Sequence, residues 1–192
     1  ERAYFDELTR LPNRSLIEKA IDQLIESGAS SFALAFIDLD GFKNINDFYG
    51  HAVGDQLLIG FAARVSASLR PTDLLARLSG DEFLLLLTPV DDAAELSARL
   101  TGLASHLQAP HYVEGYEIFS SASLGVSRYP SDGTTYYELV SNADRAMYRG
   151  KKGRKGQIQF FDASIEHVAV ETSRLEQRLR LAIRDRRVRC AY

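Results

Sequence analysis

The sequence has little cysteine, no long hydrophobic run and no excess of basic residues. Its single cysteine, Cys190, excludes an internal disulfide framework and is typical of a reducing compartment. No stretch has the length and apolar character of a membrane span or a signal peptide. A net charge of −3 argues against a nucleic acid or an anionic membrane surface as the main partner. We therefore expect a cytoplasmic domain with no nucleic-acid partner, and we leave open whether a longer parent protein is membrane-anchored.

What the chain does contain is 45% hydrophobic residues over 192 positions, enough for the core of one domain and a short remnant. Apolar periodicity and turn residues alternate between helix and strand patterns. Helices are predicted at residues 14–26, 54–69, 91–108 and 135–149, and strands at 32–38, 74–78, 83–87, 112–113, 116–119, 121–128 and 158–161. This alternation predicts an α/β (α+β) fold with a mixed central sheet and surrounding helices.

The predicted hairpin at residues 74–87 carries two adjacent acids at its turn. Gly80 supplies the backbone freedom of a tight turn, and Asp81 and Glu82 follow it directly. Two carboxylates on an exposed turn cost little free energy. Gathering them with further acids causes electrostatic repulsion, which a cation or a proton must compensate. Taken alone, the pair fits a solvated loop as well as it fits a functional site.

Further acids stand at the end of the strand predicted at residues 32–38. Asp38 and Asp40 share one face by the two-residue period of a strand. One interpretation is a metal site, in which Asp38 and an acid of the hairpin hold Mg²⁺ for a nucleoside triphosphate. The other is structural, with Asp40 and Asp47 capping the turn that follows. The occurrence of both acidic segments in one chain favours the metal site.

Several motifs follow one another in an order that resembles a known family. They are Asp6-Glu7-Leu8-Thr9, Leu11-Pro12-Asn13-Arg14, the runs 36–47 and 49–55, Ser79-Gly80-Asp81-Glu82-Phe83 and Ala143-Asp144-Arg145-Ala146-Met147-Tyr148. Together they resemble the GGDEF domain, the family of diguanylate cyclases, from about Tyr4 to Asp162. The resemblance implies a five-stranded sheet similar to that of nucleotidyl cyclases and polymerase palms. It also implies condensation of two GTP molecules into cyclic di-GMP with release of pyrophosphate.

The resemblance implies a role for each acid. Asp38, the carbonyl of Leu39 and Asp81 would bind Mg²⁺, with Mn²⁺ as the alternative metal. Asp81 and Glu82 would be catalytic, acting through the metal on the attacking hydroxyl or accepting its proton directly. The sequence leaves these two roles open.

Phosphate contacts are implied on two segments. The backbone N–H groups of Gly41, Phe42 and Lys43 form a candidate anion-binding turn, to which the lysine adds charge. Lys151 and Lys155 resemble the family's distal phosphate contacts. The ending at residues 154–156 departs from the family's glycine-arginine-asparagine pattern, and a solvated basic loop is the alternative interpretation.

Guanine selection is implied at Asn46 and Asp55. An amide and a carboxylate together meet the acceptor and donor groups of a guanine edge, which adenine would leave mismatched. Gly80 would let the base approach the hairpin backbone. Ser79 replaces the first glycine of the family signature, and a positive φ there would cost about 1 kcal/mol of strain. The structural alternative for Asp55 is a first-turn helix residue.

A possible product site precedes the hairpin. Arg70 and Asp73 stand in the RxxD pattern, which resembles the family's inhibitory site for cyclic di-GMP, and Arg77 is a further candidate contact. An arginine can hold a guanine edge or a phosphate, and the aspartate can accept guanine N–H groups. The alternative is an ordinary turn at a helix end.

The tail differs in character from the rest of the chain. Leu175, Leu179 and Ile183 recur at four-residue steps among arginines, which predicts an amphipathic helix. We expect residues 1–162 to form the GGDEF domain. Residues 163–192 resemble the linker helix and first strand of a truncated EAL phosphodiesterase domain, although a plain C-terminal helix is the alternative.

Two functional hypotheses remain. The first is an Mg²⁺-dependent diguanylate cyclase that binds GTP, works as a homodimer and is inhibited by its product. The second is a catalytically weak module that binds GTP or cyclic di-GMP and regulates an adjoining EAL domain. The intact acids favour the enzyme, whereas Ser79 and the altered ending at residues 154–156 keep the regulatory module open.

Overall fold

The computed structural model describes residues 4–164. The chain divides into two units, Glu1–Phe161 and Asp162–Tyr192, and all helices and strands named below lie in the first. In the second, Ser164 donates both its backbone N–H and its hydroxyl to the Asp162 carboxylate. The tail predicted to begin an EAL domain falls almost wholly outside the described residues. Within residues 4–164 no helix combines the length and apolar character needed to cross a membrane.

The first unit is built on a five-stranded sheet, as the family resemblance implied. The strand order is β2 (Leu74–Ser79), β3 (Glu82–Leu87), β1 (Phe32–Leu39), β6 (Ala122–Tyr129) and β7 (Ile158–Phe160). The first four strands pair antiparallel, and β7 runs parallel to β6. The mixed central sheet is therefore confirmed, and β1 lies at its centre.

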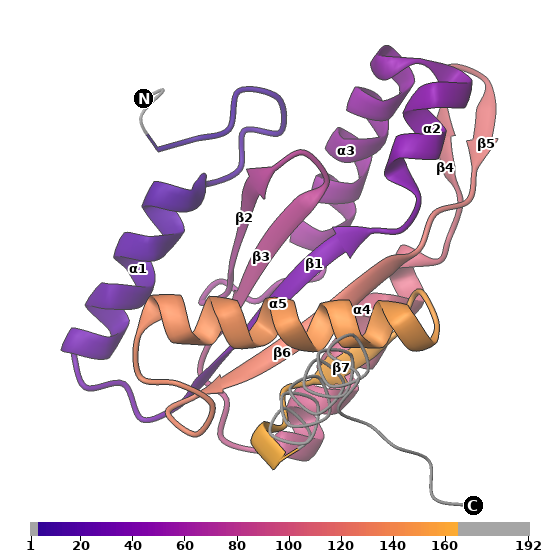
Figure 1. The fold of residues 1–192 in the computed structure, drawn as a ribbon. Coiled ribbons are helices and arrows are strands. Elements are labelled where there is room, and N and C mark those ends of the chain that lie inside the picture. Colours follow the sequence, from indigo (N-terminus) through magenta and orange to yellow (C-terminus); the bar gives the residue numbers. More distant parts are fainter. Residues whose placement is uncertain (1–3, 165–192) are drawn as a thin grey trace, which may run out of the picture. The chain divides into compact units, whose positions relative to one another are not determined.

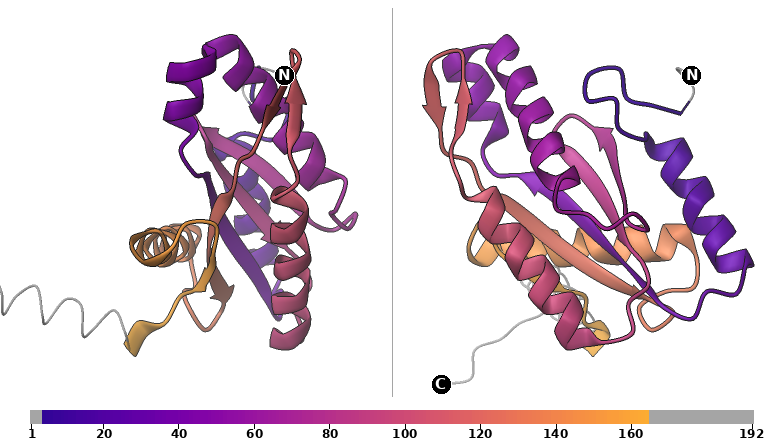
Figure 2. Two further views of the ribbon diagram at one scale, coloured as in Figure 1. Left: turned by 90° about the vertical axis from the view of Figure 1, so that its right-hand side faces the viewer. Right: turned by 180° about the vertical axis from the view of Figure 1, so that it is seen from behind.

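Helices cover both faces of this sheet (Figures 1 and 2). One face packs against α1 (Arg14–Glu26) and α5 (Tyr136–Gly153), and the other packs against α3 (His51–Ser66) and α4 (Ala93–Leu107). Beyond the end of β1 lie α2 (Phe42–Tyr49) and the hairpin of β4 (His111–Val113) and β5 (Tyr116–Ile118). The hairpin turn between β2 and β3 lies at the same end of the sheet.

The alternation of β1 decides which way its acid points. Ala33, Ala35 and Ile37 belong to the core on the α3–α4 side, whereas Leu34 and Phe36 belong to the core on the α1–α5 side. Because side chains alternate along a strand, Asp38 follows the second set and faces α5. The end of α5 can therefore reach this carboxylate.

A close approach of α5 to β6 depends on Gly125. A Cβ atom at this position would lie 2.0 Å from the carbonyl oxygen of Ala143 and 2.3 Å from the backbone nitrogen of Met147. Only a residue without a side chain permits this contact. Gly125 on β6 thus sets how closely α5 packs against the sheet. It also sets how close to the sheet the polar groups near the end of α5 lie.

The predicted helix boundaries hold for α1 but not around residue 50. Asn13 caps α1, its side chain accepting the backbone N–H of Leu16 at 3.2 Å. The predicted turn at residues 41–43 instead starts a helix, α2, which the sequence did not predict, and α3 begins at His51 rather than Gly54. Gly50, at φ +89°, ends one helix and starts the next within a single residue. The two helices therefore form a tight pair.

Candidate functional site

Three carboxylates meet where β1 ends and β3 begins. The strand register places Asp38 opposite Glu82, and the backbone N–H of Leu39 donates to the carbonyl oxygen of Asp81 at 3.3 Å. Burial raises the pKa of the Asp81 carboxyl, and the negative charge of Asp38 raises it further. The negative charge gathered by these acids attracts a cation.

Lys151, near the end of α5, is the cation that faces these acids. Its ammonium donates to an Asp38 carboxylate oxygen and lies 3.9 Å from an oxygen of Asp40. Its charge also works against the rise in the pKa of Asp81. The lysine predicted as a phosphate contact therefore lies beside the predicted metal ligands.

Asp144, on the same helix, belongs to this cluster and was not predicted as a site residue. Burial is the main cause of the raised pKa of its carboxyl, and the negative charges of Glu82 and Asp38 raise that pKa further. It precedes Lys151 by seven residues, which is two helical turns, so both side chains lie on the same stripe of α5. That spacing was the signal available in the sequence.

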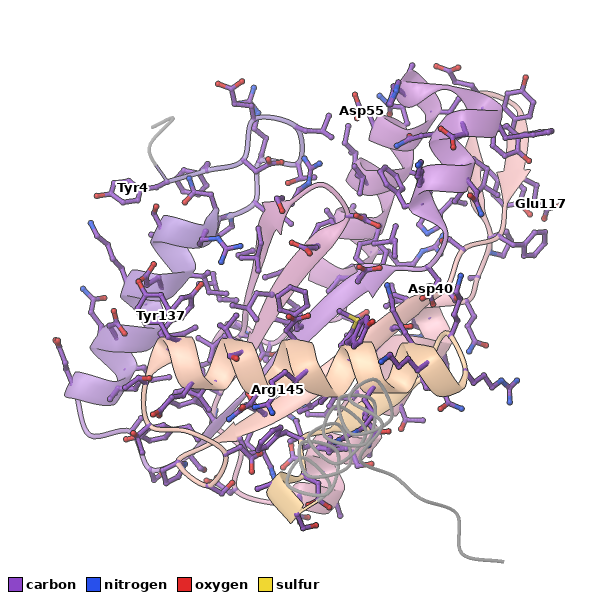
Figure 3. All side chains as sticks on the ribbon, viewed as in Figure 1. Tyr4, Asp40, Asp55, Glu117, Tyr137 and Arg145 are labelled. Atoms are coloured by element: carbon purple, nitrogen blue, oxygen red, sulfur yellow. The ribbon has the colours of Figure 1, made fainter. Side chains whose placement is uncertain are left out.

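Asp40 has a different surrounding from Asp38. Its buried carboxylate accepts hydroxyl hydrogen bonds from Ser121 at 2.7 Å and Ser123 at 2.8 Å. Ser123 in turn accepts the backbone N–H of Gly156 at 3.2 Å. Figure 3 labels Asp40 near the end of α5. Through the two serines, Asp40 links the end of β1 to the start of β6 and to the loop after α5. It does not cap the following turn, which was the structural alternative considered for it.

The donor set suits a hard cation. Asp38 and Asp81 provide carboxylate oxygens. Leu39, the residue after Asp38, provides a backbone carbonyl oxygen. Within residues 4–164 no group of three or more histidine, cysteine, aspartate or glutamate side chains is arranged to hold a metal. Mg²⁺ commonly binds through one or two carboxylates and completes its shell with water and substrate phosphates. The residues present fit that mode of binding.

The candidate phosphate segments border the acids. Gly41, at φ +74°, starts α2 without a side-chain cap, so the first N–H groups of the helix have no side-chain acceptor. Phe42 is buried beneath this turn and Lys43 is exposed. Lys155 is also exposed and directly precedes Gly156, which contacts Ser123.

The candidate guanine residues lie on the α2–α3 pair. Asn46 of α2 has a buried amide oxygen without a hydrogen-bond partner among the described residues. Asp55 is exposed on the first part of α3 (Figure 3). Gly80, at the hairpin turn, has φ +49°, which confirms the predicted need for glycine there.

Arg77 fixes the shape of the signature hairpin. Its guanidinium donates twice to the carbonyl oxygen of Gly80, at 2.8 and 2.9 Å, and once to Asp6 at 2.9 Å. Burial opposes ionisation of Asp6, but hydrogen bonds from Thr9 and Arg77 hold the pKa of its carboxyl below the ordinary value. The predicted product contact Arg77 thus ties the N-terminal motif to the hairpin turn.

Ser79 does not have the strained backbone that a departure from the family signature suggested. The described non-glycine residues with positive φ are Arg10 and Glu114, so Ser79 lies outside the left-handed region. Its hydroxyl donates to the Glu82 carboxylate at 3.0 Å. Serine therefore fits this position and contacts a candidate catalytic acid.

Arg70 and Asp73 differ in exposure. The half-exposed Arg70 guanidinium pairs with Glu95 at 2.7 Å. The Asp73 carboxylate is fully buried and accepts from Arg99 at 2.5 Å and from the backbone N–H groups of Arg70 and Thr88. A pocket of about 250 Å³ beside them is lined in part by Ser68, Arg70, Arg99 and His106.

These features coincide with a match to a family model described as "Diguanylate cyclase, GGDEF domain", over residues 3–157. The chain belongs to the GGDEF family. The GGDEF domain of TpbB from Pseudomonas aeruginosa superposes with a TM-score of 0.82 at 34% identity, covering 86% of this chain and 99% of that structure. The acids and glycines described above therefore lie in a GGDEF domain homologous to diguanylate cyclases.

Relatives carry the same region within longer proteins. The bifunctional diguanylate cyclase/cyclic di-GMP phosphodiesterase MucR of P. aeruginosa is 42% identical over 99% of this chain, which spans 28% of MucR. The cyclic di-GMP phosphodiesterase NbdA of the same organism is 36% identical over the whole chain, which spans 25% of NbdA. The chain thus corresponds to about a quarter of each of these relatives.

Proposed function

We propose that this GGDEF domain is a diguanylate cyclase that joins two GTP molecules into cyclic di-GMP and releases two pyrophosphates. The observation that carries the proposal is the convergence of Asp38, Asp81 and Glu82 with Lys151 at one end of the sheet. Attack of a ribose 3′-hydroxyl on an α-phosphate needs neutralised phosphate charge and an aligned attacking group. This cluster offers groups for both needs.

In the proposed site, phosphate binding and proton transfer are assigned to different polar groups. Phosphate oxygens would bind to Lys151, Lys155, Lys43 and the N–H groups at the start of α2 beside Gly41, because lysine ammonium groups and uncapped helix N–H groups attract anions. Asp81 or Glu82 would accept the proton of the attacking hydroxyl, and the Ser79 hydroxyl, which donates to Glu82, supports that role for Glu82.

The metal proposed is Mg²⁺, with Mn²⁺ as an alternative. Asp38, the carbonyl of Leu39 and Asp81 would hold it, and when bound it would supply charge neutralisation at the phosphates. The chain's own part is to present the carboxylates of Asp38 and Asp81 at one end of the sheet, where Lys151 donates a hydrogen bond to Asp38.

Guanine recognition rests on Asn46 and Asp55. The carboxylate accepts the N–H groups of the base, and the amide donates to its oxygen. The exposed carboxylate of Asp55 and the packing of the Asn46 amide against the neighbouring Gly54 support a ligand at the α2–α3 pair. Adenine would leave these groups unmatched, so GTP should bind in preference to ATP.

Catalysis is proposed to need two copies of the domain. One site holds one GTP, whereas each product molecule contains two nucleotides, so two sites must face each other across a two-fold axis.

Product binding at Arg70, beside the 250 Å³ pocket, is proposed to inhibit the enzyme.

An adjoining EAL domain in the parent protein is a further proposal, suggested by the phosphodiesterase activity named for MucR and NbdA.

A regulatory module that binds GTP without turning it over is the second candidate. NbdA, which matches this whole chain, is named as a phosphodiesterase alone. That name favours a GGDEF domain whose role is to influence a neighbouring hydrolase. Binding of GTP without product formation would be its signature.

The deciding experiment incubates the purified chain with GTP and Mg²⁺ and identifies products by mass. A version fused to a dimeric coiled coil removes dependence on weak association, and ATP serves as the control substrate. We expect cyclic di-GMP from GTP, formed at a rate per domain that rises with protein concentration in the unfused chain. GTP that remains bound and intact in the fused protein would reject the cyclase and support the regulatory module.

A further inference from the structure

The contact between Gly54 and Asn46 joins the two helices that carry the candidate guanine groups. A Cβ atom at Gly54 would lie 1.8 Å from the amide oxygen of Asn46, 2.9 Å from its Cγ atom and 3.3 Å from the ring of Phe42. Real Cβ atoms do not approach other atoms so closely. The amide of Asn46 therefore occupies the space that any side chain at position 54 would fill.

The backbone holds the two residues in this arrangement. The N–H of Gly50 donates to the carbonyl of Asn46 at 2.9 Å, and the N–H of Gly54 donates to the carbonyl of Gly50 at 3.2 Å. The positive φ of Gly50 turns the chain sharply between them. Asn46 and Gly54 are thus fixed against each other by the geometry of the turn as well as by packing.

The contact also orients the amide. Its oxygen is buried against Gly54 and has no hydrogen-bond partner among the described residues. Because the oxygen and the NH₂ group of an amide diverge, the NH₂ group points away from Gly54. It makes no hydrogen bond within the part of the chain that the structure describes, so its two donors remain for a ligand.

We propose that Gly54 is a positioning residue for nucleotide selection, which acts by holding the Asn46 amide with its donors toward the base. The inference rests on the proposed function, since it takes the guanine of GTP as the ligand. Gly54 touches no substrate itself. Its contribution is the missing Cβ, which leaves room for the amide beside Asp55, the next residue of α3.

The test compares Gly54→Ala with Asn46→Ala, with the double variant and with the native chain. Calorimetry measures the affinity of each protein for GTP and for ATP in the presence of Mg²⁺. We expect Gly54→Ala to weaken GTP binding about tenfold, the scale of one lost hydrogen bond, and to leave ATP binding unchanged. In the double variant the alanine at position 54 should cause no further loss, because no amide remains to be displaced.

Gly102→Ala is the matched control. Gly102 is also a helical glycine, in α4, but a Cβ there would meet nothing within 4 Å. This variant should bind both nucleotides as the native chain does. Thermal unfolding gives a second readout, in which Gly54→Ala lowers the melting temperature and the added Asn46→Ala restores it by making room for the new methyl group.

The outcomes separate this inference from the proposed function. A native chain that binds GTP and ATP equally would reject guanine recognition and the role of Gly54 together. A native chain that prefers GTP, with a folded Gly54→Ala variant that keeps that preference, would overturn the role of Gly54 alone. Strictly additive losses of GTP affinity in the double variant would also overturn it, since the glycine would then act independently of Asn46.

Discussion

The Lys151 ammonium donates a hydrogen bond to the Asp38 carboxylate across 113 residues of sequence. The contact forms because Asp38 faces α5 from the central strand and Gly125 lets that helix approach the sheet closely. A cation from the chain itself therefore stands at the carboxylate proposed to bind metal. In the proposed site, Lys151 would compete with the metal for Asp38 until the phosphates of a nucleotide attract the lysine.

Lys151→Met should consequently have opposite effects on metal and nucleotide. Without nucleotide, we expect Mn²⁺ to bind roughly five- to tenfold more tightly, since a partly exposed ion pair contributes about 1 kcal/mol. GTP should bind more weakly because a phosphate contact is lost. Lys152→Met is the control, since Lys152 lies over the Tyr148 ring instead, 4.6 Å from its centre. Weaker Mn²⁺ binding by Lys151→Met would argue against this competition.

The two acids proposed as metal ligands should be needed for metal binding and dispensable for folding. Asp38→Asn and Asp81→Asn should each lose Mn²⁺ binding and reduce cyclic di-GMP formation by roughly 10²–10³-fold. Asp22→Asn, which changes an exposed acid on α1, should retain both properties. Titration of Mn²⁺ followed by a turnover assay measures them separately. Unchanged metal affinity in both variants would remove these acids from the metal site.

Replacing Ser79 by glycine and Gly80 by serine should destabilise the domain by different amounts. Ser79 ends β2 without a left-handed backbone, so Ser79→Gly should lower the free energy of unfolding by roughly 0.5–1 kcal/mol. Gly80 has φ +49°, so Gly80→Ser should cost roughly 1–2 kcal/mol. Urea titration measures both values. A gain in stability from Ser79→Gly would mean that serine is strained at this position after all.

Much of this arrangement follows from local sequence, and the remainder depends on tertiary contacts. The apolar run ending at Asp38 and the glycine turn before Asp81 predicted two strands whose acids meet, and the structure brings them together. The helix α2 was missed because its residues were interpreted through their polar motif. Its apolar residues Phe42, Ile45 and Tyr49 follow a helical spacing and pack in the core.

Other features could not have been predicted from one segment at a time. Asp73 shares a motif with Arg70, but its burial depends on Arg99 from α4, 26 residues away. The Asn46–Gly54 contact likewise depends on how sharply the chain turns at Gly50. The strain considered for a positive φ at Ser79 does not arise, because the turn places its positive φ at Gly80 instead.

Substitution of Asp73 should mainly reduce stability, whereas substitution of Arg70 should mainly weaken product binding. Asp73→Asn leaves the Arg99 charge without its buried partner, so we expect a loss of roughly 2–4 kcal/mol in the free energy of unfolding. Arg70→Ala should change stability by less than about 0.5 kcal/mol, because its pair with Glu95 is half exposed. It should instead weaken cyclic di-GMP binding by roughly 10- to 100-fold. Unaltered product affinity in Arg70→Ala would show that this segment is only a turn.

His111 should make the stability of the domain depend on pH. This histidine is 4% exposed, its Nε2 atom is buried without a partner among the described residues, and it packs against Gly60 of α3. Burial lowers the pKa of its imidazole from 6.5 to about 4, and the nearby charge of Arg64 adds to this effect. The unfolded chain therefore binds a proton at a pH where the folded chain does not. Stability is complete above pH 6.5 and falls as the pH drops toward 4.

The expected loss attributable to His111 is about 2 kcal/mol between pH 7.5 and pH 5, from the difference between the two pKa values. Urea unfolding at both pH values measures it in the native chain and in His111→Gln, in which the side chain cannot titrate. The variant should be less sensitive to pH, whatever its stability at pH 7.5. His106→Gln removes an exposed histidine and should keep the native sensitivity. Equal pH dependence in the native chain and His111→Gln would show that the buried imidazole accepts its proton without unfolding.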